Sequence, residues 1–157
     1  MPFDHTVLKE NFGDIWPIHV DGFTELLITL RRQFRGDLDM MLVLAIIGSR
    51  TLPSRRTRGM SYQDFADGTR LDPRPSPINL QSVAECSGIP RETVRRKVRD
   101  LRALGWVDRR DDGVLVVNEK AAQDLAPATE ATLRYLIAIG SACVGAAARA
   151  QQHEREP

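Results

Sequence analysis

The stretch from Ile78 to Val117 decides how this chain folds, and it reads INLQSVAECSGIPRETVRRKVRDLRALGWVDRRDDGVLVV. Asn79 predicts the start of a short helix, because asparagine is favoured at the N-cap, and Gly88 predicts its left-handed end. Pro90 suits the beginning of a second helix, where its missing N–H group costs nothing. Two helices joined by so short a glycine-containing turn form a helix-turn-helix.

The second helix, expected over Arg91–Leu104, has two distinct faces when its residues are spaced at about 100° each. Its apolar arc, expected to face the core, contains Val94, Val98, Leu101 and Leu104. Its opposite arc contains Arg91, Glu92, Arg95, Arg96, Arg99 and Arg102. From Arg91 to Arg110 there are eight basic and three acidic residues, a net charge of +5, whereas the whole chain carries only +1. A helix face this basic suits a polyanion, and duplex DNA is the commonest one.

A two-stranded hairpin is expected directly after this helix. Gly105 predicts the helix end, and the segments Trp106–Arg110 and Val114–Val117 have the pattern of strands around an Asp-Asp-Gly turn. Arg109 and Arg110 would then lie near the hairpin tip.

The stretch resembles the winged helix-turn-helix of bacterial transcription regulators. Its segment PRETVRR is similar to the start of the recognition helix in the catabolite-activator (Crp/Fnr) families. The layout, with helices before and after the wing, is more similar to the multiple-antibiotic-resistance regulator (MarR) family. One departure is Lys97, where both families usually have an apolar residue. Its stem would have to snorkel past the core, or its ammonium group would have to meet an acid from elsewhere.

The resemblance implies base contacts for Arg91, Glu92 and Arg96, and the positions on the helix and hairpin predict two classes of DNA contact. The residues nearest the base edges in the major groove would be Arg91, Glu92, Arg95 and Arg96. The residues holding mainly phosphates would be Arg99, Arg102, Arg109 and Arg110. The alternative is that this basic face is merely solvated, as charged helix faces usually are.

Length and composition suit one domain, or a small domain with helical extensions, because the 157 residues are 42% hydrophobic. The longest apolar run, Met40–Ile47, is too short to span a bilayer. The first ten residues lack the pattern of a signal peptide, so a cytoplasmic protein without membrane contact is expected.

Before the helix-turn-helix, residues 1–20 are expected to form an arm with one short helix, which packs Phe3, Phe12 and Trp16 onto the body or a partner. Asp21 predicts the N-cap of an amphipathic helix that ends at Gly36. Its apolar positions are Phe23, Leu26, Leu27, Leu30 and Phe34.

Asp37 predicts the cap of a buried helix over Leu38–Gly48, and Ile78–Leu80 is expected to form a short strand. The connection between them, residues 50–77, is unusually long, with one helical segment expected over Ser61–Ala66. It is either a solvated insertion or a basic arm that contacts the DNA backbone through Arg50, Arg55, Arg56 and Arg58.

After the hairpin, Asn118 predicts the cap of a short helix over Glu119–Leu125, and Pro127 predicts the start of a long helix to about Gln151. The apolar arc of this long helix contains Leu133, Leu136, Ile137, Gly140, Cys143, Val144 and Ala147. It is expected to pair with the same helix of a second subunit, because operators of such folds usually have two half-sites. The alternative is packing onto the chain's own N-terminal helix.

Neither a metal site nor a catalytic site is indicated. His5, His19 and His153 are expected at the surface, and Cys86 and Cys143 have no evident redox partner. Phosphate-binding loops, nucleophile elbows and paired catalytic carboxylates are missing from the sequence, which argues against an enzyme with or without a cofactor.

The sequence therefore predicts a mainly α-helical winged helix-turn-helix protein with flanking helices. The expected parts are an arm and amphipathic helix (1–36), a DNA-binding domain (37–118) and dimerisation helices (119–157). The expected function is regulation of transcription by a homodimer on double-stranded DNA. A winged-helix module that docks an acidic protein is the alternative. A small-molecule effector could bind between the aromatic arm and the dimer helices, but no residue identifies it.

Overall fold

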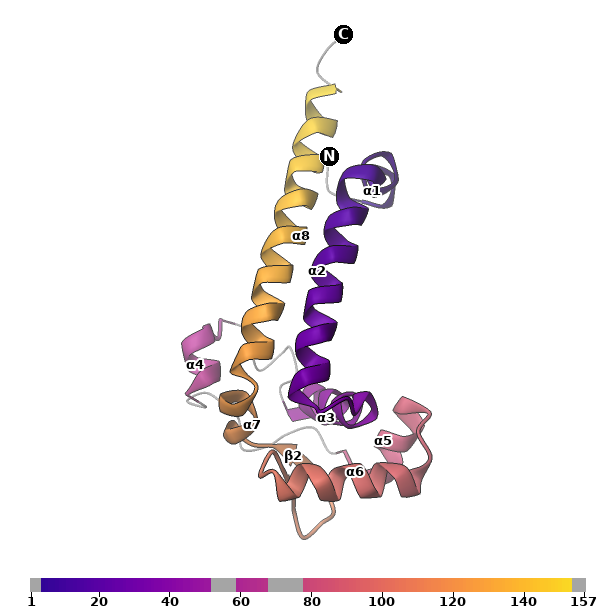
Figure 1. Cartoon of the computed structure of the whole chain (residues 1–157), viewed down its shortest axis with the longest axis vertical. Coiled ribbons are helices and arrows are strands. Elements are labelled where there is room, and N and C mark those ends of the chain that lie inside the picture. The colour runs from indigo at the N-terminus through magenta and orange to yellow at the C-terminus, as the bar shows by residue number, and fades with distance from the viewer. Residues whose placement is uncertain (1–3, 52–58, 68–77, 154–157) are drawn as a thin grey trace. The chain divides into compact units, whose positions relative to one another are not determined.

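The computed structural model describes residues 4–51, 59–67 and 78–153, which form a mainly helical protein with one two-stranded antiparallel sheet (Figure 1). Phe3, three arginines of the suggested basic arm (Arg55, Arg56 and Arg58) and residues 154–157 lie outside the described residues. The elements in chain order are α1 (His5–Glu10), α2 (Phe12–Gln33), α3 (Leu38–Thr51), α4 (Tyr62–Ala66), α5 (Leu80–Ser87), α6 (Arg91–Ala103), β1 (Val107–Arg109), β2 (Leu115–Val117), α7 (Glu119–Asp124) and α8 (Ala126–His153).

The chain divides into two compact units. One unit combines Met1–Leu30 with Pro127–Pro157, and the other is the continuous segment Arg31–Ala126. We call them the helical unit and the central unit, respectively.

The core of the central unit lies where α3 meets α5, α6 and β2. Its fully buried side chains include Val43, Ile47, Val83, Leu101 and Leu115. The expected complete burial of α3 is wrong in part, because Leu38 and Leu42 are exposed. This helix is apolar almost all round, yet only one side of it meets the other elements.

The hairpin forms as expected, with Val107 paired to Val117 and Arg109 paired to Leu115. The expected strand at Ile78–Leu80 does not form, because Leu80 already begins α5. Ile78 still accepts one hydrogen bond, at 2.8 Å, from the N–H group of Leu115.

Thr51 ties the end of α3 to the hairpin. Its buried hydroxyl donates to the Ile47 carbonyl at 3.1 Å and accepts from the Val117 N–H group at 3.0 Å. This contact explains why α3 continues to Thr51 instead of ending at Gly48. The expected helical segment in the long connection is confirmed as α4, which begins with a capping box between Ser61 and Asp64.

The short helix expected within residues 1–20 is confirmed as α1, but the rest of the expected arm belongs to α2. Asp4 caps α1, and α2 begins at Phe12, so that Asp21 lies inside a helix of 22 residues. Pro17 also lies inside α2. A proline at this position removes the backbone hydrogen bond to residue i−4, which weakens the helix. Burial of Ile15 against Val7 and Ala146 holds this first part of α2 in place.

In the helical unit, α2 and α8 are antiparallel neighbours. Tyr135 of α8 lies against His19, Gly22 and Phe23, and its hydroxyl is 2.8 Å from His19 Nδ1. Further along, Arg149 donates to Asp14 at 3.0 Å. His19 is therefore half-buried and bonded, which corrects the expected surface histidine, whereas His5 is exposed as expected.

The long helix α8 is apolar over most of its length. Among the described residues, the segment Ala126–Gln152 is long and apolar enough, by length and composition alone, to cross a membrane. Only 11% of its most apolar window is buried inside the structure. The sequence analysis missed this segment because its apolar character comes mostly from alanine and glycine rather than from one run of large side chains.

Candidate nucleic-acid interface

Local capping interactions place α5 and α6. The Asn79 side chain accepts from the Ser82 N–H group at 3.0 Å, and Gly88 ends α5 in the left-handed conformation, with φ of 72°. Pro90 occupies the N-cap of α6. At the other end, Gly105 has φ of 76°, and the Trp106 N–H group bonds to the Leu101 carbonyl at 3.0 Å. The Gly105 N–H group also bonds to the Arg102 carbonyl. Together the two hydrogen bonds form a Schellman motif, which determines where the helix ends.

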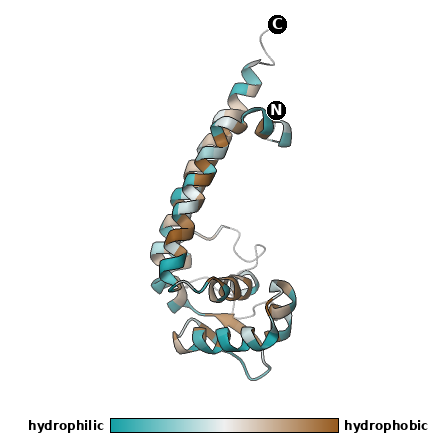
Figure 2. Ribbon diagram, turned by 45° about the vertical axis from the view of Figure 1, so that its right-hand side comes forward, coloured by the Kyte–Doolittle hydropathy of each residue, from teal (hydrophilic) through white to brown (hydrophobic). Residues whose placement is uncertain are grey.

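The two faces of α6 are separated as expected. Val94, Val98 and Leu101 are buried in the core of the central unit. All eight residues predicted to contact DNA are exposed, which leaves the outer face of α6 hydrophilic (Figure 2). They are Arg91, Glu92, Arg95, Arg96, Arg99, Arg102, Arg109 and Arg110.

The exposed face has little internal neutralisation. Glu92 accepts from Arg95 at 2.8 Å, and Asp100 lies 3.6 Å from Arg99. Exposed pairs of this kind contribute only about 0–1 kcal/mol and break readily. Within the described residues, Arg91, Arg96 and Arg102 form no ion pair, so their guanidinium groups are available to an external anion. A shallow hollow of about 340 Å³ is lined by Glu92, Arg95, Arg96 and Arg99.

The hairpin extends this basic surface. Gly113, with φ of 84°, closes a turn in which its N–H group bonds to the Arg110 carbonyl at 2.9 Å. The Asp112 carboxylate accepts from the Val114 N–H group at 3.0 Å, so this acid serves the turn itself. Arg109 and Arg110 lie at the end of β1, and in Figures 1 and 2 the turn projects past α6.

Lys97 meets an acid from 60 residues earlier in the chain. Its ammonium group donates to Asp37 Oδ2 at 2.5 Å, and the other carboxylate oxygen of Asp37 caps α3 through the Met40 N–H group. Partial burial raises the pKa of Asp37, but the hydrogen bonds from Lys97 and Met40 and the charges of Lys97 and Arg96 lower it by more. The pKa of Asp37 therefore lies below its ordinary value, and the pair anchors α6 to the start of α3.

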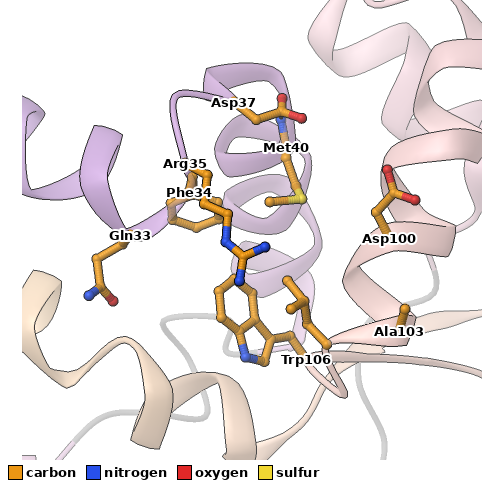
Figure 3. A pocket seen from close by; sticks show the side chains of 9 residues that line it. Gln33, Phe34, Arg35, Asp37, Met40, Asp100, Ala103 and Trp106 are labelled. Carbon is orange, nitrogen blue, oxygen red and sulfur yellow. The ribbon is translucent and has the colours of Figure 1, made fainter.

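A hollow of about 450 Å³ lies at the C-terminal half of α6 (Figure 3). Phe34 and Trp106 meet edge to face at its base, with ring centroids 5.6 Å apart, and Met40 adds to the apolar lining. Arg35 and Asp100 supply polar groups on opposite sides of it. This hollow is in the central unit, whereas the sequence suggested an effector site between the arm and the dimer helices.

Trp106 also forms a hydrogen bond with Asp124 of α7. Its indole N–H group donates to Asp124 Oδ2 at 2.7 Å, and Lys120 donates to the same oxygen. These two bonds, Lys120 first, lower the pKa of Asp124 below its ordinary value despite partial desolvation. The polar Lys97 at a usually apolar position indicated a partner acid, but neither Asp37 nor Asp124 could be identified from the sequence, because the partners are 60 and 18 residues apart.

Two further expectations concern cysteine and metal chemistry. Cys86 is exposed and Cys143 is half-buried, and both are free cysteines. Among the described residues, the structure brings together no group of three or more His, Cys, Asp or Glu side chains that could hold a metal ion.

The residues predicted for the dimer interface lie in the helical unit. Leu136, Ile137 and Val144 are 53%, 68% and 71% exposed, and Leu133, Gly140 and Ala147 are partly exposed. A Cβ atom added at Gly140 would have no neighbour within 4 Å. The chain's own α1 and α2 pack on another side of α8, which takes up Cys143 of the predicted arc but leaves Leu136, Ile137 and Val144 exposed.

The chain is similar to a protein that is named as regulatory. The chain is 31% identical over 94 residues to the regulatory protein CysR of Synechococcus elongatus, and these residues cover 60% of this chain. The match covers only 41% of that relative, so the chain spans less than half of its length. No protein-family model matches the chain, and no solved structure matches it significantly.

Proposed function

We propose that the chain is a transcription regulator that binds specific sequences of duplex DNA as a homodimer. The observation that carries this proposal is the outer face of α6, where exposed arginines follow a short α5, a glycine turn and a buried apolar stripe. The similarity to a protein named as regulatory supports it. Regulation rather than catalysis, and a cytoplasmic location, are part of the same proposal.

In this proposal, residues 37–118 form a winged helix-turn-helix with α6 as the recognition helix. Residues near the N-terminus of such a helix contact bases, which assigns this role to Arg91, Glu92, Arg95 and Arg96. The Glu92–Arg95 pair, at 2.8 Å, then orients both side chains before DNA arrives. The phosphate contacts are assigned to Arg99, Arg102, Arg109 and Arg110.

The homodimer is proposed to form through the exposed apolar arc of α8. Large exposed apolar patches on soluble proteins usually mark interaction sites. Leu136, Ile137 and Val144 of the arc are exposed, and Gly140 leaves room for a close neighbour. Glu25 and Arg134, 3.5 Å apart, lie between α2 and α8. This inter-helix ion pair favours a water-exposed helix pair over a membrane span.

For a small-molecule effector we propose the hollow beside Phe34 and Trp106. Its volume of about 450 Å³ is within the usual range for ligand sites, about 300–1,000 Å³. Because Asp100 and Ala103 of α6 line it, an occupant would contact the proposed recognition helix directly.

The DNA-binding proposal is tested by titrating the protein against duplexes selected from a random pool and against scrambled duplexes, at two salt concentrations. Arg96→Ala should weaken binding to the selected duplex by about 1–3 kcal/mol and relax the preference at one position. Arg110→Ala should weaken binding to both duplexes about equally and reduce the salt slope by about one unit.

Both side chains are exposed, so neither variant should change stability by more than about 0.5 kcal/mol. Equal affinity of the wild-type protein for the selected and scrambled duplexes would contradict the proposal. Tighter binding to an acidic protein surface than to DNA, with no sequence preference, would instead favour the interaction module.

A further inference from the structure

The pair of helices α2 and α8 has one polar and one apolar side. Arg134–Glu25 and Arg149–Asp14 join the two helices along the polar side. Tyr135 and His19 mark the line where the helices face each other. Both helices therefore have a defined orientation, from which the positions of all other side chains follow at about 100° per residue.

A second apolar stripe lies on α2. At about 100° per residue, five of its exposed side chains fall within an arc of roughly 80°. These are Phe12, Trp16, Val20, Phe23 and Leu27. Going round α2 in the sense in which residue number increases, this arc comes directly after the side that faces α8. The apolar arc of α8 is displaced in the same sense from the side that faces α2. Because the helices are antiparallel, these two rotations place both apolar arcs on the same side of the helix pair, opposite the ion pairs.

We infer that this side docks against a second copy of the chain, with the α2 stripe of each subunit packed on the α8 arc of its partner. The inference rests on the proposed DNA-binding homodimer and specifies its geometry. It replaces the α8-to-α8 pairing that the sequence suggested.

The exposed area favours this arrangement. The exposed parts of the eight large side chains on both helices amount to roughly 800 Å², taking about 150–250 Å² for a whole large side chain. That is about the area that one partner contributes to an interface of standard size. The three large side chains on α8 supply less than half of this exposed area; they are Leu136, Ile137 and Val144. Pairing α8 with α8 would therefore leave the α2 stripe exposed to water.

The chain connections favour the same arrangement. Leu30 of α2 and Pro127 of α8 lie at the same end of the antiparallel pair, so both links to the central unit leave at that end. Two DNA-binding parts that contact one duplex must leave the dimer at a common end. A two-fold axis along the helices meets this condition, and an axis at the centre of the apolar side places α8 of one subunit face to face with α2 of the other.

Side-chain size also matches across the proposed interface. The Tyr135–Gly22 contact sets the axial level of the two helices, which places Gly140 between Trp16 and Val20. A two-fold axis along the helices preserves these levels. The large indole of Trp16 would then lie over the turn of α8 at Gly140, where the structure leaves space for it.

Crosslinking tests the geometry directly. In a background with Cys86→Ser and Cys143→Ala, one chain carries Trp16→Cys and a differently tagged chain carries Gly140→Cys. A short bis-maleimide should link the two tags in high yield, whereas Gly140→Cys alone should give little linked dimer. The opposite result, with efficient Gly140→Cys self-linking and no mixed product, would overturn the inference in favour of α8-to-α8 pairing.

Sedimentation of the full chain separates this inference from the proposed function. Trp16→Ser and Gly140→Leu should each raise the dimer dissociation constant at least tenfold. The control Ile18→Ser, an exposed apolar residue that lies outside the α2 stripe, should leave it unchanged. If Gly140→Leu disrupts the dimer and Trp16→Ser does not, the homodimer stands and the inferred geometry fails. Sedimentation of the wild-type protein as a monomer would overturn both the geometry and the homodimer. Flotation of the wild-type protein with phosphatidylcholine vesicles would do the same.

Discussion

Removal of the Asp37 carboxylate would eliminate two interactions of different kinds. Asp37 caps α3 by accepting from the Met40 N–H group at 2.9 Å, and it neutralises Lys97, whose side chain is only 14% exposed. Loss of an N-cap costs about 1 kcal/mol. An unpaired buried charge can cost about 3–5 kcal/mol, but the flexible lysine stem can carry its ammonium group towards water, which reduces this to about 1–2 kcal/mol. Asp37→Ala should therefore destabilise the central unit by about 2–3 kcal/mol.

Two matched variants separate the contributions. Asp37→Ser keeps a capping oxygen and should lose only the second contribution, about 1–2 kcal/mol. Lys97→Met removes the ammonium group and leaves the Asp37 carboxylate, which is 30% exposed and still caps α3, so this variant should stay within about 1 kcal/mol of the wild type. In combination, Lys97→Met should restore most of the stability lost in Asp37→Ser.

The measurement is urea unfolding followed by the fluorescence of Trp106, which is buried in the central unit. Trp16→Phe in every variant leaves Trp106 as the sole tryptophan. The pKa of Asp37 is lower in the folded protein than in the unfolded chain, so its carboxylate stabilises the fold above the unfolded pKa, about 4. This stability should disappear as the pH falls through the lower folded-state pKa, and Asp37→Asn should abolish that part of the acid dependence. If Lys97→Met proved as destabilising as Asp37→Ala, the ion pair itself would stabilise the fold and this reasoning would be refuted.

Three further substitutions test the contacts that position the candidate interface. Thr51→Val keeps the shape but leaves an N–H group of β2 without its acceptor, so thermal or urea unfolding should show a loss of about 1–2 kcal/mol. Gly105→Ala must adopt φ of 76°, and should lower stability by about 1–2 kcal/mol in the same measurement, with no loss expected for an exposed alanine elsewhere on α6. Trp106→Phe removes a donor from Asp124, so an NMR titration should show the pKa of Asp124 rising towards its ordinary value, and an unchanged pKa would contradict the assigned bond.

The ends of the helices around the candidate interface could be predicted because local chemistry determines them. Asn79 and Asn118 each bond to an N–H group two or three residues further on, and Gly88 and Gly105 adopt left-handed conformations that favour glycine. These interactions are complete within a few residues. The exposed arginine face of α6 could be predicted for the same reason, since it follows from helical spacing once the helix ends are known.

The errors occur where residues distant in sequence decide the structure. Asp21 has the chemistry of an N-cap, yet α2 starts nine residues earlier because Ile15 packs on Val7 and Ala146, and Arg149 binds Asp14. Capping preference is worth about 1 kcal/mol, and burial of one large aliphatic side chain is worth about 1.5–3 kcal/mol. The longer helix therefore wins, and only the tertiary contacts could have revealed it.

The charge on α6 is itself an argument about function. Like charges three or four residues apart on a helix destabilise it by about 0.2–0.5 kcal/mol per pair, and Arg91, Arg95 and Arg99 form a row with this spacing. Glu92 and Asp100 neutralise only part of the face, through exposed contacts at 2.8 Å and 3.6 Å. A helix selected for stability alone would alternate its charges, so the excess of arginine is a local conflict of the kind expected at functional sites. Added salt screens this repulsion and should stabilise the free central unit, whereas the same salt should weaken binding to a polyanion. The proposed DNA binding therefore predicts opposite salt dependences for folding and for binding, whereas a merely solvated helix face predicts only the first.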